Sequence, residues 1–399
     1  MNAVPPPAAS GIAIAGAGPA GSAAAILLAR AGRAVTLVER DRAPAHKVCG
    51  EFISPEAVAD LHALGLDLAG LGAQRIARLR LVRGARLVES PLPFTAASLT
   101  RRTLDAALQA LAESSGATLL RGRTVRALRA HALDLDDGTT LPADAVLLAT
   151  GKHDLRAHRR APPRATPPLV GFKTYWRLAP AQSAALSGHV EVLLFPRLGR
   201  ADAGGGTYGG LQPVEGGAAN LCLLVSRARL DAAAGRWDAV LDALYADCPH
   251  LRTRLHGATP LLDRPLTIAG VPYGYVHRGP SDGLFRVGDQ ACVIPSFTGD
   301  GMAIALHGAR LAARTILSGG TPDDHARRLR ADVARPMRAA RALSALGRTG
   351  AGQGALMAAC ATWPGVIRAA ALATRVSQQA SMGSAQTRKG SSDPLIPLT

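Results

Sequence analysis

The chain of 399 residues has few aromatic side chains and no paired cysteine motif. Phe, Trp and Tyr together make up 4%, so the chain lacks the aromatic platforms on which proteins stack single-stranded nucleic acid. The five cysteines are odd in number and include no C-x-x-C pair, which argues against a disulfide framework or a zinc site. No apolar run reaches membrane-spanning length, and no charged segment followed by an apolar core marks a signal peptide. We therefore expect a cytoplasmic protein without a metal site.

Acidic residues and lysines are also scarce, so the net charge is +17 and is carried almost entirely by arginine. The only lysines are Lys47, Lys152, Lys173 and Lys389. A basic chain often binds nucleic acid, an anionic membrane surface or acidic ligands. The arginines are scattered and are not interleaved with aromatics, which favours compositional bias over a nucleic-acid interface. We expect no nucleic-acid partner and leave peripheral contact with a membrane open.

Glycine is abundant, and one glycine-rich stretch, residues 11–40, has the clearest pattern in the chain. A short apolar strand leads into Gly16, Gly18 and Gly21, which have the spacing G-x-G-x-x-G before an Ala- and Leu-rich helix. A second strand ends at Glu39, where a carboxylate can accept hydrogen bonds from ribose hydroxyls. Gly16 permits the turn, Gly18 lets a pyrophosphate approach the helix N-terminus, and Gly21 allows close packing. The stretch predicts a dinucleotide site, and the alternative is a glycine-rich turn without a ligand.

Four further motifs accompany this fingerprint. KVCGEFISPEA (residues 47–57) follows it as a loop and a helix start, and TRRTLD (100–105) opens another helix. LLATG (147–151) ends an apolar strand at a glycine turn. GLFRVGDQA (283–291), followed by PSFTGDG (295–301), leads from a strand into a long helix. Two separated halves of one site are more specific than either half alone.

With these motifs the sequence resembles the geranylgeranyl-reductase-like branch of the FAD-dependent oxidoreductases that are similar to para-hydroxybenzoate hydroxylase, the group A flavoprotein monooxygenases. The resemblance implies FAD as cofactor and NADPH or NADH as electron donor. Arg101, with Arg102 as reserve, would approach the FAD phosphate and ribitol, Asp289 would bind the ribitol hydroxyls, and the amides of residues 299–302 would cap the pyrimidine edge. The full set implied to bind FAD is Gly16, Gly18, Pro19, Ala20, Gly21, Glu39, Arg40, Gly50, Arg101, Val125, Gly151, Gly288, Asp289, Pro295, Gly299, Asp300, Gly301 and Met302.

The expected fold is α/β: a Rossmann-like FAD-binding domain of the glutathione-reductase type, a substrate domain built on a β-sheet, and C-terminal helices. The FAD-binding domain would comprise residues 1–168 and 281–330, and the substrate domain residues 169–280. The helices would occupy residues 331–376, interrupted at Pro336 and Pro364, and a disordered tail would follow over residues 377–399.

Cys49 and Glu51 are the candidate catalytic residues. Their loop must pass the flavin on its way to the next helix, and Gly50 lets the backbone run close to a planar ring. This places the Cys49 sulfur or the Glu51 carboxylate at the mouth of the substrate cavity, and His46 and Lys47 would favour the thiolate. The alternative is a buried, inert thiol.

Three functions are compatible with these residues. The first is a monooxygenase that hydroxylates a bulky hydrophobic or aromatic molecule, polyketide- or isoprenoid-like. The second is an FAD-dependent alkene reductase of the geranylgeranyl reductase type. The third is a flavin-binding redox protein without turnover. All three require a hydrophobic small molecule or a redox partner beside the flavin.

Overall fold

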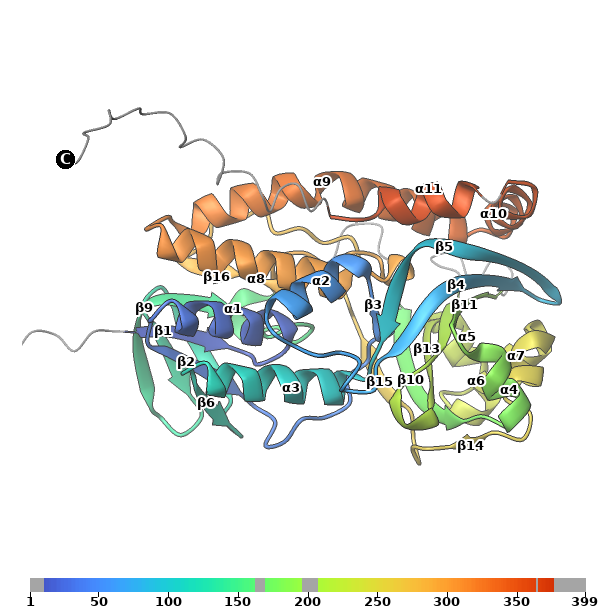
Figure 1. Cartoon of the computed structure of the whole chain (residues 1–399), viewed down its shortest axis with the longest axis horizontal. Helices are drawn as coiled ribbons and strands as arrows, with labels where there is room; N and C mark the ends of the chain where they lie inside the picture. Colours follow the sequence, from blue (N-terminus) through green and yellow to red (C-terminus); the bar gives the residue numbers. More distant parts are fainter. Residues whose placement is uncertain (1–10, 162–168, 196–206, 364, 377–399) are drawn as a thin grey trace, which may run out of the picture.

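The computed structural model describes residues 11–161, 169–195, 207–363 and 365–376. The lead-in predicted for residues 1–10, the end of the predicted first domain (162–168) and the tail predicted from residue 377 lie outside the described residues. Within them the chain forms two sheets side by side, and the C-terminal helices, orange to red in Figure 1, extend along both.

The first sheet has seven strands in the order β6-β2-β1-β9-β8-β7, with β16 paired to β9. The strands β16, β9, β1, β2 and β6 are parallel to one another, as in a dinucleotide-binding fold. Their bounds are β1 (Gly11–Ala15), β2 (Val35–Glu39), β6 (Thr118–Arg121), β7 (Val125–Arg129), β8 (Ala132–Leu135), β9 (Thr140–Leu148) and β16 (Leu284–Arg286).

The alternation of apolar residues along β1 explains why both faces of this sheet are covered. Ile12 and Ile14 face the main core, whereas Ala13 and Ala15 face a second core formed with β7 and β8. The main core lies under the helices α1 (Pro19–Arg30), α2 (Pro55–Ala63), α3 (Arg101–Ser114) and α8 (Gly301–Leu317). Each of these helices begins within a predicted motif or at its end, so the motifs gather at one edge of the sheet.

The second sheet has nine strands in the order β14-β10-β13-β12-β11-β4-β5-β3, with β15 paired to β10. Their bounds are β3 (Phe52–Ile53), β4 (Gln74–Arg83), β5 (Arg86–Ser98), β10 (Leu169–Arg177), β11 (His189–Leu194), β12 (Tyr208–Pro213), β13 (Ala219–Ser226), β14 (Thr259–Pro260) and β15 (Leu266–Ala269). The short helices on its outer face are α4 (Pro180–Leu186), α5 (Arg227–Ala232), α6 (Trp237–Asp247) and α7 (Pro249–Arg254).

The predicted boundary at residue 168 does not separate the two sheets. Strand β4 pairs with β11, and β5 pairs with β4 and β3, so residues 52–98 supply three strands to the second sheet. Residues 52–98, which the sequence assigns to the FAD-binding domain, therefore connect the two halves of the molecule.

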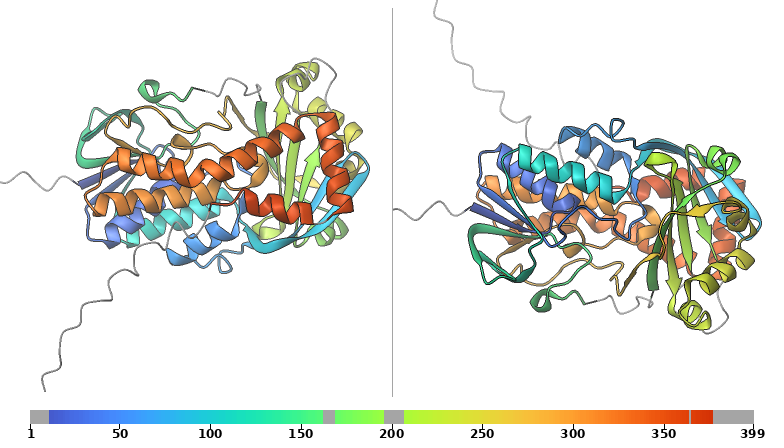
Figure 2. Two further views of the ribbon diagram at one scale, coloured as in Figure 1. Left: turned by 90° about the horizontal axis from the view of Figure 1, so that it is seen from above. Right: turned by 90° about the horizontal axis from the view of Figure 1, so that it is seen from below.

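The C-terminal helices are α9 (Pro322–Gly347), α10 (Gly350–Thr362) and α11 (Gly365–Ala373). The predicted break at Pro336 is wrong, because α9 continues through it. Val333, Met337 and Ala340 are buried on this face of α9 against Ile304 of α8, and this packing compensates for the missing backbone donor. Figure 2 shows α9 crossing from the first sheet to the second, where α10 and α11 lie over the strands.

Hydropathy singles out one pair among these helices. Within the described residues no single helix has the length and apolar character needed to cross a bilayer. The helices α10 and α11 meet that length and composition only when they are taken together, and they are bent by 118° at the break between them.

Candidate FAD and substrate site

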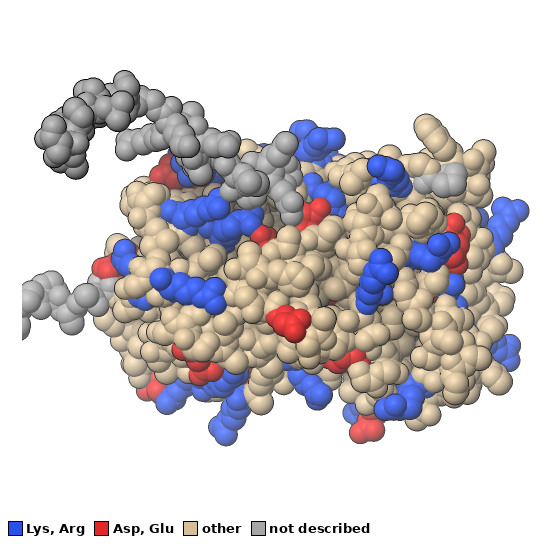
Figure 3. Space-filling model, viewed as in Figure 1, with Lys and Arg blue, Asp and Glu red and all other residues tan. Residues whose placement is uncertain are grey.

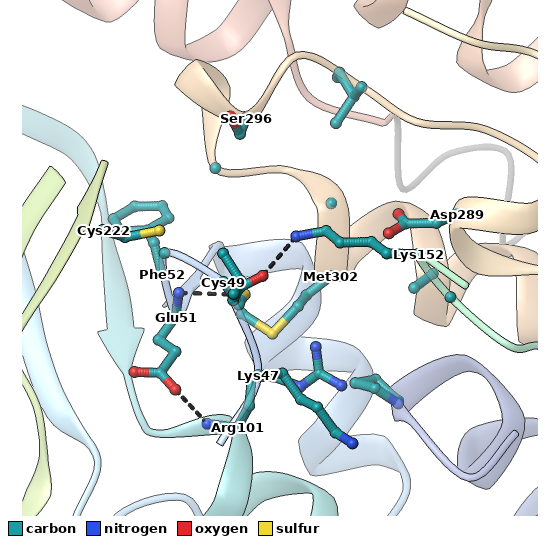
Figure 4. Close-up of a pocket in the computed structure, with 18 of the residues that line it drawn as sticks. Lys47, Cys49, Glu51, Phe52, Arg101, Lys152, Cys222, Asp289, Ser296 and Met302 are labelled. Atoms are coloured by element: carbon teal, nitrogen blue, oxygen red, sulfur yellow. Dashed lines mark hydrogen bonds between the residues drawn. The ribbon is translucent and has the colours of Figure 1, made fainter. Parts of the chain in front are cut away.

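One cavity of about 830 Å³ lies between the two halves of the molecule. At one end it is bordered by the N-termini of α1 and α8, and at the other by the second sheet and the helices α10 and α11. Figure 4 shows side chains from the second sheet, from α8 and from the loops after β9 and β16 around the loop that carries Cys49. The cavity therefore joins the predicted dinucleotide motifs to an apolar chamber.

The three glycines of the fingerprint have different surroundings. A Cβ on Gly21 would lie 1.8 Å from the carbonyl oxygen of Gly16, so Gly21 is required for packing. Gly16 has φ +105°, which a side chain disfavours, and it makes the turn out of β1. Gly18 is the N-cap of α1, and the nearest atom to a Cβ there is Nη2 of Arg101 at 3.4 Å. The space over Gly18 is therefore open to a ligand at the helix N-terminus.

Glu39 is held at the end of β2 by backbone amides. Its Oε2 accepts a hydrogen bond from the N–H of Ala17 at 3.0 Å, and its Oε1 accepts one from the N–H of Asp41 at 3.1 Å. A carboxylate has about four acceptor positions, so these two bonds fix its orientation and leave capacity for hydroxyl groups.

Arg101, rather than its reserve Arg102, borders the cavity. The guanidinium of Arg101 forms two hydrogen bonds of 2.8 Å with the carboxylate of Asp105, one turn along α3. This bidentate pair holds the arginine beside Gly18, where it can meet a phosphate.

The second half of the site lies at the start of α8. Asp289 and Gly301 border the cavity, and Gly299 has φ +73° at a position where a Cβ would lie 2.7 Å from the Phe52 ring. Asp300 is fully buried and forms an ion pair with Arg375, which follows α11. Burial raises the pKa of Asp300 to about 7, against the opposing attraction of Arg375.

Most of the predicted site residues lie around this one cavity. Those that line it are Gly16, Gly18, Pro19, Ala20, Glu39, Arg40, Cys49, Gly50, Glu51, Arg101, Val125, Gly151, Gly288, Asp289, Gly299, Gly301 and Met302. The other three predicted residues, Gly21, Pro295 and Asp300, do not border the cavity and lie behind the residues that do. We therefore expect these three to support the site without touching a bound group.

Side chains from other elements hold the backbone of the Cys49 loop. Lys173 of β10 donates to the carbonyl of Lys47 at 3.0 Å, and Lys152 donates to the carbonyl of Val48 at 2.6 Å. The amide of Asn220 donates to the carbonyl of Gly50 at 2.9 Å. Three consecutive parts of the loop are thus fixed, which sets the position of the Cys49 thiol.

Glu51 is buried beneath this loop rather than exposed at its mouth. It has φ +62°, which is uncommon for a residue with a side chain. Its carboxylate is fully buried and forms an ion pair with Lys173, and Oε1 also accepts from the Tyr175 hydroxyl at 2.8 Å. The N–H of Arg101 donates to the same oxygen at 2.6 Å. Cys49 and Glu51 both border the cavity, but Glu51 is fully buried whereas Cys49 is partly exposed.

Burial decides the protonation of these groups. Burial raises the pKa of Glu51 above its ordinary value, against the attraction of Lys173 and the hydrogen bonds from Arg101 and Tyr175. Burial also raises the pKa of Cys222, a second thiol on the cavity wall, to about 11. Cys222 is therefore a neutral thiol at physiological pH.

The positive charge nearest the Cys49 thiol comes from Arg101, whose guanidinium interacts with the Cys49 side chain, and not from the two residues expected. Lys47 pairs with Asp41. Burial, together with the nearby charge of Lys173, lowers the pKa of His46 to about 4, so its ring is neutral at physiological pH. Neither side chain supplies the charge that the sequence suggests beside Cys49.

No sequence motif includes the residues that hold the loop: Lys152, Lys173, Tyr175 and Asn220. A usable signal existed for Lys173, because it is one of four lysines and directly follows the run Leu169–Phe172, which has no polar side chain. A charged residue in such a strand needs a partner of opposite charge. Its partner is Glu51, 122 positions earlier in the chain, and no local pattern connects the two.

Comparisons with known proteins support this geometry. A family model described as pyridine nucleotide-disulphide oxidoreductase matches residues 10–162. The chain is 31% identical over 329 residues to the menaquinone reductase of Mycolicibacterium smegmatis, covering 78% of this chain and 77% of that protein. The chain belongs to the same family of FAD-dependent oxidoreductases as that enzyme. The structure thereby confirms the predicted α/β fold with an FAD-binding Rossmann domain.

Solved structures share the fold of this flavoprotein at low sequence identity. A triple mutant of the flavin-dependent brominase Bmp2 has a TM-score of 0.72 at 15% identity, covering 94% of this chain and 97% of the brominase. PqsL of Pseudomonas aeruginosa, a probable FAD-dependent monooxygenase, has a TM-score of 0.65 at 17% identity, covering 92% and 99%. These similarities establish the fold, and together with the family they identify the chain as an enzyme.

The residues around the cavity fit FAD. A Cβ on Gly50, Gly151 or Gly301 would meet no atom within 4 Å, so the lining leaves room along the length of the cavity. The N-termini of α1 and α8 present helix-dipole positive ends at two separate places, as a dinucleotide with a reducible ring requires. Gly18 and Arg101 would hold the pyrophosphate, Glu39 the ribose, and the Gly301 end of α8 the flavin ring.

Proposed function

We propose that this flavoprotein reduces a carbon–carbon double bond in the isoprenoid chain of a lipid, and that the lipid is of the quinone class. The observation that carries the proposal is the apolar chamber continuous with the FAD site. Its wall is formed by residues of β4, β5, β11, α9, α10 and α11: Leu79, Leu81, Leu92, Val190, Val192, Leu343, Leu356, Val366 and Ile367.

The form of this chamber suits a long hydrocarbon better than a compact polar substrate. Burying apolar chain against leucine, valine and isoleucine stabilises binding by about 0.8 kcal/mol for each CH₂ group. The charged Arg375 at the edge of the chamber is already paired with Asp300, so it does not oppose an apolar ligand. Similarity to a protein named menaquinone reductase supports the same class of substrate.

FAD bound here would, once reduced, supply a hydride to one alkene carbon and return to its oxidised form, and a proton must reach the other carbon. In this chain the Cys49 thiol lies on the cavity wall, and its sulfur accepts a 3.4 Å hydrogen bond from the N–H of Glu51. A neutral thiol is a proton donor. We propose that the loop around Cys49, whose backbone is held by Lys152, Lys173 and Asn220, positions this thiol beside the flavin ring.

The test is a single anaerobic turnover. The purified enzyme is reduced with dithionite, which makes the result independent of the predicted NADPH or NADH donor, and is mixed with a short-chain menaquinone. We expect the oxidised flavin absorption to return and the lipid to gain two hydrogen atoms that are not lost on exposure to air. A quinone with a saturated chain is the matched control and should leave the flavin reduced.

Other outcomes are distinguished by the same experiment. A product that regains its mass in air is a quinol, which would place reduction at the ring and contradict the proposal. The monooxygenase interpretation predicts that reduced enzyme with oxygen and substrate adds one oxygen atom. No reoxidation by any lipid would favour a redox protein without turnover.

A further inference from the structure

The outer face of the α10–α11 pair has an unusual composition for a protein surface. Helix α10 contains no charged residue, and α11 contains one, Arg368. A surface helix of a soluble protein normally places charged and polar side chains toward water. The exposed residues here are instead mainly small or apolar: Ala351, Ala355, Ala358, Ala359, Ala361, Thr362, Trp363, Arg368, Ala369 and Leu372. We call these ten residues the α10–α11 outer face.

Two large side chains project from this face. Trp363, at the bend between the helices, is 71% exposed, and Leu372 near the end of α11 is 53% exposed. Tryptophan combines an apolar ring with a polar N–H, and it is enriched where apolar and aqueous phases meet. Because both side chains are exposed, their apolar surface is in contact with water. A binding partner would cover that surface.

The inner face of the same pair is the wall of the substrate chamber. Leu356 and Cys360 of α10 and Val366, Ile367 and Ala370 of α11 line the cavity. The pair is therefore a layer one helix thick, with the apolar chamber on one side and the outer face on the other.

Charge favours an anionic partner. The net charge is +17, Arg368 lies on the outer face, and Arg348 precedes α10 by two residues. A basic residue near a bilayer that contains anionic lipids contributes about 1 kcal/mol to binding. Arginine also extends its charged end to the headgroups while its stem stays in apolar surroundings.

We infer that the α10–α11 outer face docks on the surface of an anionic lipid bilayer, from which the enzyme draws its lipid substrate; the second clause rests on the proposed function. Contacts with β4 and β5 cover the inner side of the pair, so the helices lie along the bilayer surface and do not cross it. A second copy of the chain on the same face is the alternative that the test must separate.

The first experiment is flotation of the full-length protein with vesicles of phosphatidylcholine, with and without phosphatidylglycerol. We expect binding that requires phosphatidylglycerol. The double variant Trp363→Ser/Leu372→Ser should bind at least tenfold more weakly. Leu317→Ser is the matched control, because Leu317 is 44% exposed at the end of α8, and it should bind as the unaltered protein does.

Charge is tested separately. Arg368→Glu should weaken binding by on the order of tenfold or more, since it replaces a favourable charge by an unfavourable one. Arg126→Glu, at an exposed position on β7, is the control with the same change in net charge and should have a smaller effect. Equal loss in both variants would mean that net charge alone is responsible and would overturn the assignment to this face.

Turnover separates failure of docking from failure of the proposed function. The outer-face variants should reduce menaquinone embedded in vesicles more slowly, but should reduce a water-soluble short-chain analogue at the unaltered rate. Vesicle binding that is the same in variants and unaltered protein overturns the docking inference, whatever the activity. A dimer in light scattering that the double variant abolishes, without vesicle binding, would assign the face to a second copy. Face-dependent vesicle binding without reduction of the isoprenoid chain would leave the docking inference standing and refute the proposed function.

Discussion

At the scale of single residues, the buried pair of Lys173 and Glu51 is the most consequential contact in the site. Both side chains are fully buried, and removing one charge of such a pair leaves the other without compensation. Lys173 also donates to the carbonyl of Lys47, so the pair joins the second sheet to the loop that carries Cys49. Its loss should affect stability and the position of the loop together.

The first prediction concerns this pair. Lys173→Met should lower the free energy of unfolding by about 3 to 5 kcal/mol, because it leaves the buried Glu51 carboxylate without its ion-pair partner. The double variant Lys173→Met/Glu51→Gln should lose less than the sum of the two single losses. Urea denaturation of the three variants measures this coupling. Strict additivity would show that the two side chains do not stabilise each other.

The second prediction concerns Gly18 and Gly21, which lie three residues apart and have different roles. Gly18→Val should keep the fold but lose FAD, because its side chain enters open space at the N-terminus of α1. Gly21→Ala should destabilise the fold itself, since its Cβ would collide with the carbonyl oxygen of Gly16. Flavin absorbance and thermal unfolding distinguish the two outcomes. Normal flavin content in a folded Gly18→Val protein would contradict the placement of the pyrophosphate.

The third prediction concerns Cys49. Cys49→Ala should retain FAD and remain within about 1 kcal/mol of the unaltered stability, because the side chain is small and its hydrogen bond from the N–H of Glu51 is long, at 3.4 Å. Turnover with the short-chain quinone should fall. Cys222→Ala removes the other thiol on the cavity wall and serves as the control for lost volume. Unaltered turnover of Cys49→Ala would leave the thiol a packing role alone.

At the scale of elements, local motifs could be predicted from the sequence, whereas long-range pairings could not. The strand–glycine–helix unit around Gly18 and the helix start after Ser54 depend on neighbouring residues, and both are where the sequence places them. Strand β4 lies within the residues that the sequence assigns to the FAD-binding domain, but its partner β11 begins more than 100 residues later. Nothing local specifies that pairing, so the sequence does not indicate that β4 belongs to the second sheet.

The fourth prediction concerns His325, whose side chain connects α9 to strand β16 of the first sheet. Its ring is 1% exposed, and its Nε2 hydrogen-bonds to the carbonyl of Arg286 at 3.0 Å. Burial lowers the pKa of His325 from 6.5 to about 4. Between these values the unfolded chain binds a proton that the folded chain does not, so stability falls as pH falls from 6.5 to 4. The loss amounts to on the order of 3 kcal/mol.

The measurement is the difference between two pH profiles. His325→Gln retains an N–H donor for Arg286 and does not titrate, so its stability should fall less across this window. The comparison is needed because the raised pKa of Asp300, about 7, acts in the opposite direction over part of the same range. Parallel profiles for the two proteins would contradict a buried neutral histidine.

At the scale of the whole molecule, the site exists only because two sheets and three C-terminal helices meet. The FAD end belongs to the first sheet, the apolar chamber to the second, and α9 crosses between them (Figure 2). Each motif predicts its own contact with the cofactor, but the chamber has no motif, because its walls are ordinary apolar residues brought together by the fold. The class of cofactor is therefore readable from the sequence, and the shape of the substrate site is not.

The fifth prediction concerns the net charge of +17, which we expect to support binding to anionic membranes but not to DNA. On the face shown in Figure 3, basic side chains are dispersed, with acidic ones among them, and form no continuous stripe. Several arginines are also engaged inside the molecule: Arg254 pairs with Glu191, and Arg160 pairs with Asp154. Duplex DNA needs many phosphate contacts at once, so a face with dispersed charges such as this one should bind it weakly at physiological salt. A titration of labelled duplex against salt concentration tests this, with the anionic vesicles as the positive control in the same buffer. Tight binding with a steep fall of log affinity against log salt would show that the scattered charges do form a nucleic-acid surface.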